Sequence, residues 1–418
     1  MRRLALGLAV CVAAVSALAL PADRVDARPQ NNGQQSDGTH AKAELTFVGV
    51  TILDGLGGAG TSGSVSIKDG RIRMKTGGGR RVDVDGAYLA PGFIEANGRT
   101  GFVSNAAEVT REMTANVDVA DLVDPRSSEF REAAFEGCTT VVMVPGTENL
   151  VGGLTQSYHA WSPDERAIPI AGAQKDLTVT MGNSPSRQTV RNFPPRRGPT
   201  TSIYARRPTT RMGVVWMLRQ SFLAAKGVQR PPDDADLTHY KEVLDGKRQL
   251  RIQARALQDL NAAMRLADEA GFEFVAEGVE EGYMLRDALG KRGLTVLAGP
   301  LPSVTSGSGP DFTETALRNA RILRDAGCRV VLTAGDGGGR WLREQGMFAT
   351  RYGFSRDEAL AALTSIPADL CGLKDRGRIT EGAAADVVLW SGHPMLPTSR
   401  ILLVVVDGHV VLDRTAPE

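Results

Sequence analysis

Histidine and cysteine are scarce in this sequence, with five His and four Cys among 418 residues. The histidines lie far apart, at His40, His159, His239, His393 and His409. Their spacing excludes a short-range histidine metal motif. Beyond Cys11 near the start, the cysteines are Cys138, Cys328 and Cys371, an odd number too widely separated to indicate a disulfide framework or a C-x-x-C site. We expect these three to be small buried hydrophobic residues.

Net charge is also nearly absent, since 49 Lys and Arg oppose 48 Asp and Glu for a formal charge of +1. No global field attracts the chain to nucleic acid, and no reader motif for nucleic acid is present. Locally, the stretch from Leu177 to Pro232 contains no Asp or Glu and many arginines. Its part at 185–210 is rich in proline and lacks periodicity, which predicts a long loop. That loop either clamps an acidic partner or folds over its own domain with solvated arginines.

The first residues read as a targeting segment. Arg2 and Arg3 precede an uncharged run from Leu4 to Leu20, followed by small residues, which predicts a signal peptide over 1–27. Residues 28–43 are rich in Gln, Asn and Gly and predict a flexible linker. We therefore expect an exported protein, periplasmic or extracellular, which contacts a membrane only if the leader stays uncleaved as an anchor.

The remaining chain divides into two β-rich ends and a middle of alternating helices and strands. Segments 44–90 and 374–418 carry short Val-, Ile- and Leu-rich runs separated by Gly and Asp-Gly turns, which predict antiparallel hairpins. Between them, over 91–373, amphipathic helices ending in Gly precede apolar strands. This order predicts an α/β protein, a (β/α)₈ TIM-type barrel with a small β-sandwich built from both ends of the chain.

Several strings resemble the amidohydrolase superfamily, in its imidazolonepropionase-like branch. "YLAPGFIEANGRTG" is similar to that family's first barrel strand, PGFIDxHxHxG, and "CGLKDRGRITEGAAADVVLWSGHPM" with "VVVDGHVVL" to its end. "EGCTTVVMVPGTENLVGG" and "AMRLADEAGFEFVAEGVEEGY" match in order and spacing, so the resemblance runs from about Leu45 to Leu412. It implies a hydrolase in which one or two divalent metals, usually zinc, activate water against a carbon–nitrogen bond.

The family's metal ligands are replaced in this sequence. The resemblance places its ligand motifs on Asn97 and Arg99, on Gln253 and Arg255, on Gly278 after Glu277, and on Gly335 followed by Asp336. Amide oxygens are weak neutral donors, glycine offers no side chain, and arginine brings a fixed positive charge. We therefore expect no metal and no other cofactor at this pocket.

Two roles for the degenerate pocket follow. Either Arg99 or Arg255 pairs with Asp336 or Glu277 and fills the space left by the metals, or the arginines bind an anion or carboxylate. The candidates for a general base are Asp336, which is favoured, and Glu277. The loop that carries Asn149 and ends near His159 is expected close to the pocket.

The leading functional hypothesis is an exported pseudoenzyme that serves as a binding or scaffold subunit, either as a homo-oligomer or as a hetero-oligomer with an active paralogue. One alternative is an active hydrolase acting on non-peptide or cyclic carbon–nitrogen bonds. Another is a sensor of a small molecule or anion.

Overall fold

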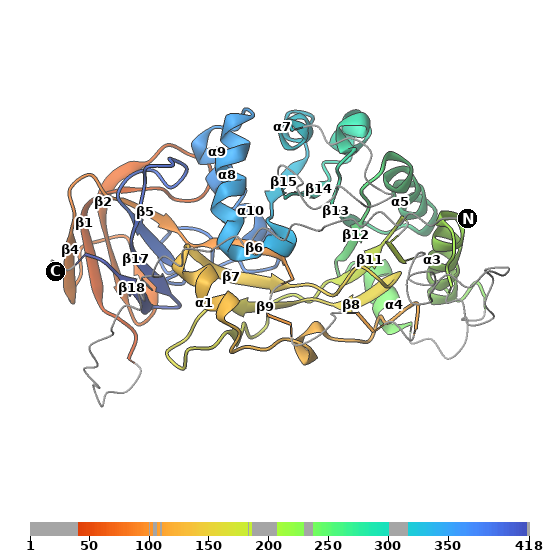
Figure 1. Cartoon of the computed structure of the whole chain (residues 1–418), viewed down its shortest axis with the longest axis horizontal. Helices are drawn as coiled ribbons and strands as arrows, with labels where there is room; N and C mark the ends of the chain where they lie inside the picture. Colours follow the sequence, from red (N-terminus) through yellow and green to blue (C-terminus); the bar gives the residue numbers. More distant parts are fainter. Residues whose placement is uncertain are drawn as a thin grey trace, which may run out of the picture. The chain divides into compact units, whose positions relative to one another are not determined.

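The computed structural model describes residues 41–99, 101–102, 107–108, 111–182, 184–185, 207–229, 237–300 and 317–415 (Figure 1). The predicted signal peptide, nearly all of the predicted linker and most of the arginine-rich loop at 185–210 lie outside these ranges. Within the described ranges, no helix combines the length and the apolar character that crossing a bilayer requires.

Both ends of the chain join in one eight-stranded sheet. Its path runs β18-β17-β16-β5-β1-β2-β3, and β4 pairs with β1. The strands are β1 (Leu45–Ile52), β2 (Thr61–Lys68), β3 (Arg71–Arg73), β4 (Arg80–Asp83), β5 (Tyr88–Pro91), β16 (Val387–Trp390), β17 (Ile401–Val406) and β18 (His409–Asp413). The antiparallel pair β5–β16, which sets Leu89 opposite Leu389, connects the two ends.

Two of the predicted Asp-Gly turns form the hairpins of this sheet. Asp69 and Gly70 connect β2 to β3, and Asp407 and Gly408 connect β17 to β18. All four residues have φ between 47° and 83°, as a two-residue turn that matches strand twist requires. A common core holds buried side chains from both chain ends, among them Phe47, Leu89, Leu389 and Val405.

The middle of the chain forms two further sheets. One has the order β10-β9-β7-β6 and the other β15-β14-β13-β12-β11-β8. Their strands are β6 (Phe93–Gly98), β7 (Cys138–Met143), β8 (Val151–Leu154), β9 (Gln156–His159), β10 (Ile168–Pro169), β11 (Leu177–Thr180), β12 (Leu250–Gln253), β13 (Phe274–Glu277), β14 (Thr295–Ala298) and β15 (Arg329–Leu332). The pair β6–β7 is parallel, and so are the neighbours from β11 to β15.

These two sheets are linked at both edges. Thr155 alone separates β8 from β9, so one bent segment belongs to both sheets. At the other edge, the N–H of Leu332 in β15 donates to Ala362 O, and the N–H of Ile94 in β6 donates to Leu363 O. The strands thus follow one another around a ring, and side chains from β6, β7, β13, β14 and β15 share an inner core that includes Ile94, Val142, Val275, Leu297 and Val331.

The described strands differ from the expected single sheet of eight parallel strands. β8 is antiparallel to β11, and β9 is antiparallel to β7. Residues 144–150, which join β7 to β8, are too few for the crossover of a dozen or more residues that a parallel return needs. The chain therefore turns back on itself here.

The predicted order of helix then strand is present where α1 precedes β7, α5 precedes β13, α6 precedes β14 and α7 precedes β15. The described helices are α1 (Ser128–Phe135), α3 (Arg211–Ala225), α4 (Thr238–Leu244), α5 (Leu257–Ala270), α6 (Arg286–Lys291), α7 (Asn319–Asp325), α8 (Leu342–Arg351), α9 (Arg356–Ala361) and α10 (Ser365–Leu370), with short 3₁₀ turns η1 (Val119–Asp121), η2 (Gly282–Leu285), η3 (Gly335–Gly337) and η4 (Gly339–Trp341). Helix α5 is typical: Leu260, Ala263 and Ala267 form its buried face, and it ends at Gly271, whose φ is 70°.

Candidate functional site

The predicted pocket residues come together at the carboxyl ends of the barrel strands. Asn97 lies in β6, and Gln253 and Glu277 are the last residues of β12 and β13, where the strand register sets them opposite each other. Arg255, Gly278 and Asp336 follow β12, β13 and β15. This is the end of the strands where barrel enzymes hold their active sites.

The interior beneath this pocket contains a buried arginine that the motif comparison did not single out. The Arg251 side chain is 1% exposed, and its Nε donates to Asp176 Oδ2 at 2.6 Å. One of its terminal nitrogens donates to Ala96 O at 2.6 Å and lies 3.4 Å from Glu277 Oε1. Arg251 therefore holds β6, β12 and β13 together and supplies a fixed positive charge between two acids.

The buried groups around Arg251 keep its guanidinium charged. Burial by itself would lower the pKa of Arg251, but Asp176, Cys371 and Glu277 outweigh it, and the pKa lies above its ordinary value. Arg251 thus stays charged. The sequence contains a signal that would have found it: Arg251, Gln253 and Arg255 alternate, and a period of two places them on one face of a strand.

At the mouth, Arg99 faces Asp336, with 3.6 Å between the nearest nitrogen and oxygen. The Asp336 side chain is 69% exposed and that of Arg99 only 18%. Two polar atoms here, Arg99 Nε and Asn97 Oδ1, are buried without a hydrogen-bond partner among the described residues. The mouth therefore offers one buried donor and one buried acceptor to a ligand or to water.

A pair between Arg255 and Glu277 was one of the arrangements expected to fill the pocket, but these two residues do not pair. Its Nε donates to Glu280 at 2.6 Å, while Glu277 is taken by Arg251. Gly278 lies directly beside Arg255: a Cβ added there would be 3.0 Å from Arg255 Cγ, and its φ of 81° disfavours any side chain. Of the two arginines, Arg99 makes one of the expected pairings, with Asp336, and Arg255 pairs with Glu280 instead.

A second residue missed from the sequence is Glu95, the one acid in the apolar run of β6. It is fully buried, and its carboxyl accepts hydrogen bonds from Thr333 Oγ1, from Ala334 N at 2.8 Å and from Asn97 N at 2.8 Å. Burial raises the pKa of Glu95 to about 7, although these donors and Arg99 act in the opposite direction. Glu95 ties β6 to the end of β15 and thereby fixes the segment that carries Gly335 and Asp336.

The expected position of His159 near the pocket is wrong. Because β9 runs antiparallel to β7, His159 lies opposite Thr140, close to the start of β7 and away from the mouth. Its Nε2 is 3.3 Å from a guanidinium nitrogen of Arg376, and burial lowers the pKa of His159. Asn149 is fully buried and donates to Glu108 O and Thr114 Oγ1, so it anchors its own loop.

The residues at the pocket do not fit a zinc ion. Within the described ranges, no cluster of three or more His, Cys, Asp or Glu side chains has the arrangement of a metal site. Besides Glu277 and Asp336, the pocket residues supply amides, glycines and two guanidinium groups, and the guanidinium groups repel a cation. Cys138, Cys328 and Cys371 are free and buried, as predicted.

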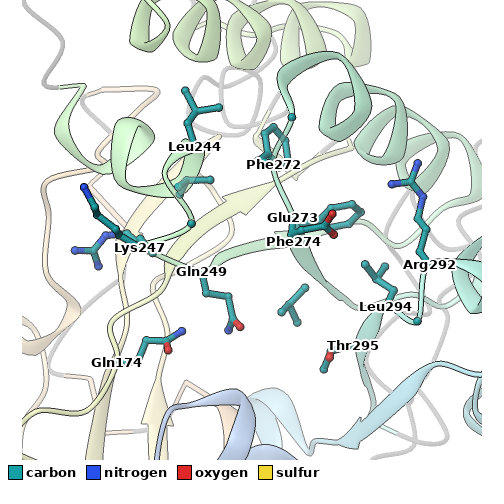
Figure 2. A pocket seen from close by; sticks show the side chains of 16 residues that line it. Gln174, Leu244, Lys247, Gln249, Phe272, Glu273, Phe274, Arg292, Leu294 and Thr295 are labelled. Atoms are coloured by element: carbon teal, nitrogen blue, oxygen red, sulfur yellow. The ribbon is translucent and has the colours of Figure 1, made fainter.

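A cleft of about 510 Å³ lies at the opposite end of the strands, near the starts of β12, β13 and β14 (Figure 2). Its cations are already paired, in the ion pairs Arg248–Glu242, Arg292–Asp268 and Lys247–Asp245. Gln174 and Gln249, both labelled in Figure 2, donate to Asp176 at 2.7 and 3.0 Å. The amides lining this cleft thus support the buried Asp176–Arg251 pair.

Comparison with known proteins gives consistent results. The model of the "Amidohydrolase family" matches residues 333–412. Imidazolonepropionase of Paracoccus denitrificans (strain Pd 1222) is 31% identical over 160 residues, which cover 36% of this chain and 38% of that relative. This match therefore spans well under half of the relative's length.

Solved structures match over most of the chain. An amidohydrolase from Thermotoga maritima MSB8 is 26% identical, with a TM-score of 0.76, over 88% of this chain and 100% of that one. A prolidase complexed with N-methylphosphonate-L-proline, 15% identical with a TM-score of 0.53 over 88% and 99% of the two chains, shares the fold alone. With the barrel strands and the joint sheet of both chain ends in place, these similarities show that the chain belongs to the amidohydrolase superfamily.

Proposed function

We propose that this protein is an exported, non-hydrolytic member of the amidohydrolase superfamily, whose barrel mouth binds a small anionic ligand. The observation that carries the proposal is the buried Arg251, bonded to Asp176 and Glu277 where β12 and β13 lie side by side. Because Glu277 is committed to Arg251, it is not free to act as a metal ligand, and the neighbouring Arg99 and Arg255 bring fixed positive charge to the mouth.

The mouth itself supports binding. Arg99 Nε and Asn97 Oδ1 are buried and lack partners among the described residues, although buried polar atoms are normally satisfied. A carboxylate or similar anion would accept from Arg99, and an N–H or O–H on the same molecule would satisfy Asn97. Asp336, exposed and 3.6 Å from Arg99, would give way to such a ligand.

We also propose a partner and a compartment for this protein, on the basis of its sequence. A retained fold with replaced ligand positions suits a binding or scaffold subunit, as a homo-oligomer or beside an active paralogue. Residues 1–27 have the features of a secretory leader. Mass spectrometry of the protein from the periplasmic or extracellular fraction tests export, and a full-length chain found only in the cytoplasm would contradict it.

The metal content of purified protein tests the central claim. Protein produced with added zinc and then dialysed is expected to contain substoichiometric zinc and to hydrolyse none of a panel of hydantoins, lactams and dipeptides. Stoichiometric zinc, or turnover that Asp336→Asn abolishes, would overturn the proposal and favour an active hydrolase.

Thermal-shift titration with small carboxylates tests the binding role. The best carboxylate should lose about tenfold in affinity in Arg99→Gln, which removes a charge-assisted hydrogen bond. Arg255→Gln is the matched control, because Arg255 is already paired with Glu280. Equal loss in both variants, or saturable binding of no carboxylate, would contradict an anion site at Arg99.

A further inference from the structure

A groove of about 740 Å³ lies outside the barrel mouth, between α8, the start of α9 and the loop around Met395. One face of α8 lines it with Glu344, Met347, Phe348 and Arg351, at the i, i+3, i+4 and i+7 spacing of a helical stripe. The face therefore carries an acid at one end, two apolar side chains in the middle and a base at the other end.

The far wall of the groove is held in place by Arg343. Its guanidinium donates to the carbonyl oxygens of Pro394, Leu396 and Ser399, each at 2.8 Å, and lies 4.7 Å from the centre of the Trp390 ring. Met395 packs against α8 so closely that a Cβ added at Gly346 would be 2.5 Å from its sulfur. The groove is thus a formed feature of the fold.

At the two charged ends of the stripe, one carboxylate oxygen of Glu344 and the guanidinium of Arg351 have no hydrogen-bond partner among the described residues. Glu344 Oε2 is buried with no hydrogen bond to any described residue. Burial raises the pKa of Glu344 and nearby Glu136 adds to this, while a hydrogen bond from its own backbone N–H and the charge of Arg343 act in the opposite direction. Among the described residues Arg351 has neither a hydrogen bond nor an ion pair, and it is exposed at the rim. A buried carboxylate oxygen without a donor is costly and calls for one from a ligand.

We propose that this groove binds a short apolar peptide with free termini, its ammonium on Glu344 and its carboxylate on Arg351. The backbone positions of Glu344 and Arg351 are seven residues apart on α8, a rise of about 10 Å, and three extended residues span about the same length. Met347, Phe348 and the buried Phe354 and Met395 provide a polarisable apolar floor that adapts to different side chains. The site is separate from the barrel mouth and does not depend on the function proposed for it.

Calorimetric titration of the purified protein with trileucine, N-acetyl-trileucine and trileucine amide tests this assignment. Trileucine should bind saturably, and each blocked peptide about tenfold more weakly, because each loses one charged contact. Glu344→Gln should weaken the binding of trileucine about tenfold and leave the binding of N-acetyl-trileucine unchanged. Arg351→Gln should weaken the binding of trileucine about tenfold and leave the binding of trileucine amide unchanged. Arg321→Gln, on α7 outside the groove, is the control.

A measurement on the unmodified protein guards against a misfolded variant. In protein with ¹³C-methyl-labelled methionine, trileucine should shift the Met347 and Met395 signals and leave Met143, which lies in the barrel, unshifted. No saturable binding, equal binding of all three peptides, or shifts elsewhere only would each overturn the proposal.

Discussion

Arg251 and Asp176 form an ion pair 2.6 Å long in which both side chains are 1% exposed. Removing one partner of such a pair leaves an uncompensated buried charge, whereas neutralising the whole cluster does not. Arg251→Met should therefore lower the free energy of unfolding by about 3–5 kcal/mol. The triple variant Arg251→Met, Asp176→Asn, Glu277→Gln should recover most of this loss. Urea denaturation followed by circular dichroism measures both, and equal stability of Arg251→Met and wild type would refute the role assigned to Arg251.

Glu95 should make stability depend on pH. Its pKa is about 7 in the folded protein against an ordinary value of 4.5, so the unfolded chain releases this proton first as pH rises. The contribution of Glu95 to stability is therefore greatest below pH 4.5 and declines between pH 4.5 and 7, by about 3 kcal/mol at most.

Unfolding free energies of wild type and Glu95→Gln at pH 5 and pH 8 test this sign. Because glutamine does not titrate, the free energy of unfolding of Glu95→Gln should increase relative to that of wild type as pH rises. A constant difference between the two proteins would show that Glu95 ionises normally in the fold.

A histidine introduced at Gly278 should not create a metal site. The φ of 81° and the 3.0 Å approach to Arg255 predict that Gly278→His destabilises the protein by about 1–3 kcal/mol. Gly246→His is the matched control, since Gly246 has φ of 70° but open space around it. The first variant should lose more stability than the control and should bind no zinc after dialysis. A stable variant with bound zinc would mean that the pocket is closer to a metal centre than its arginines indicate.

The buried thiols should be inert in the folded protein. Burial raises the pKa of both Cys328 and Cys371 to about 11, and Cys138 is fully buried as well. Ellman's reagent at pH 8 should react with these three cysteines only after denaturation. Rapid reaction of the native protein, with the modified residue identified by mass spectrometry, would reveal an opening motion at that cysteine.

Local sequence signals predicted the parts of the fold that local physics determines. The Asp69–Gly70 and Asp407–Gly408 turns follow from residues that tolerate positive φ, and α5 with its Gly271 end follows from apolar periodicity. The pairing of β5 with β16 was accessible because both ends share one composition and a family resemblance.

The candidate site was harder to predict because its decisive contacts join distant residues. Asp176 and Arg251 lie far apart in the sequence, and Arg251 stands two residues before Gln253, outside the motif that carries the family resemblance. His159 was misplaced because the sequence does not reveal that β9 turns back along β7. Arg255 pairs with Glu280, which lies on the loop after β13. The sequence does not reveal which of the nearby acids lies within reach of the Arg255 side chain.

The antiparallel pairing of β5 with β16 also determines when the protein can finish folding. Until Val387–Trp390 has been synthesised, β5 presents an unpaired strand edge of the kind that recruits other chains. The chain between β5 and β16 must lose conformational entropy before this contact forms, and the loss slows folding. During biogenesis the N-terminal strands therefore need protection until the end of the chain arrives.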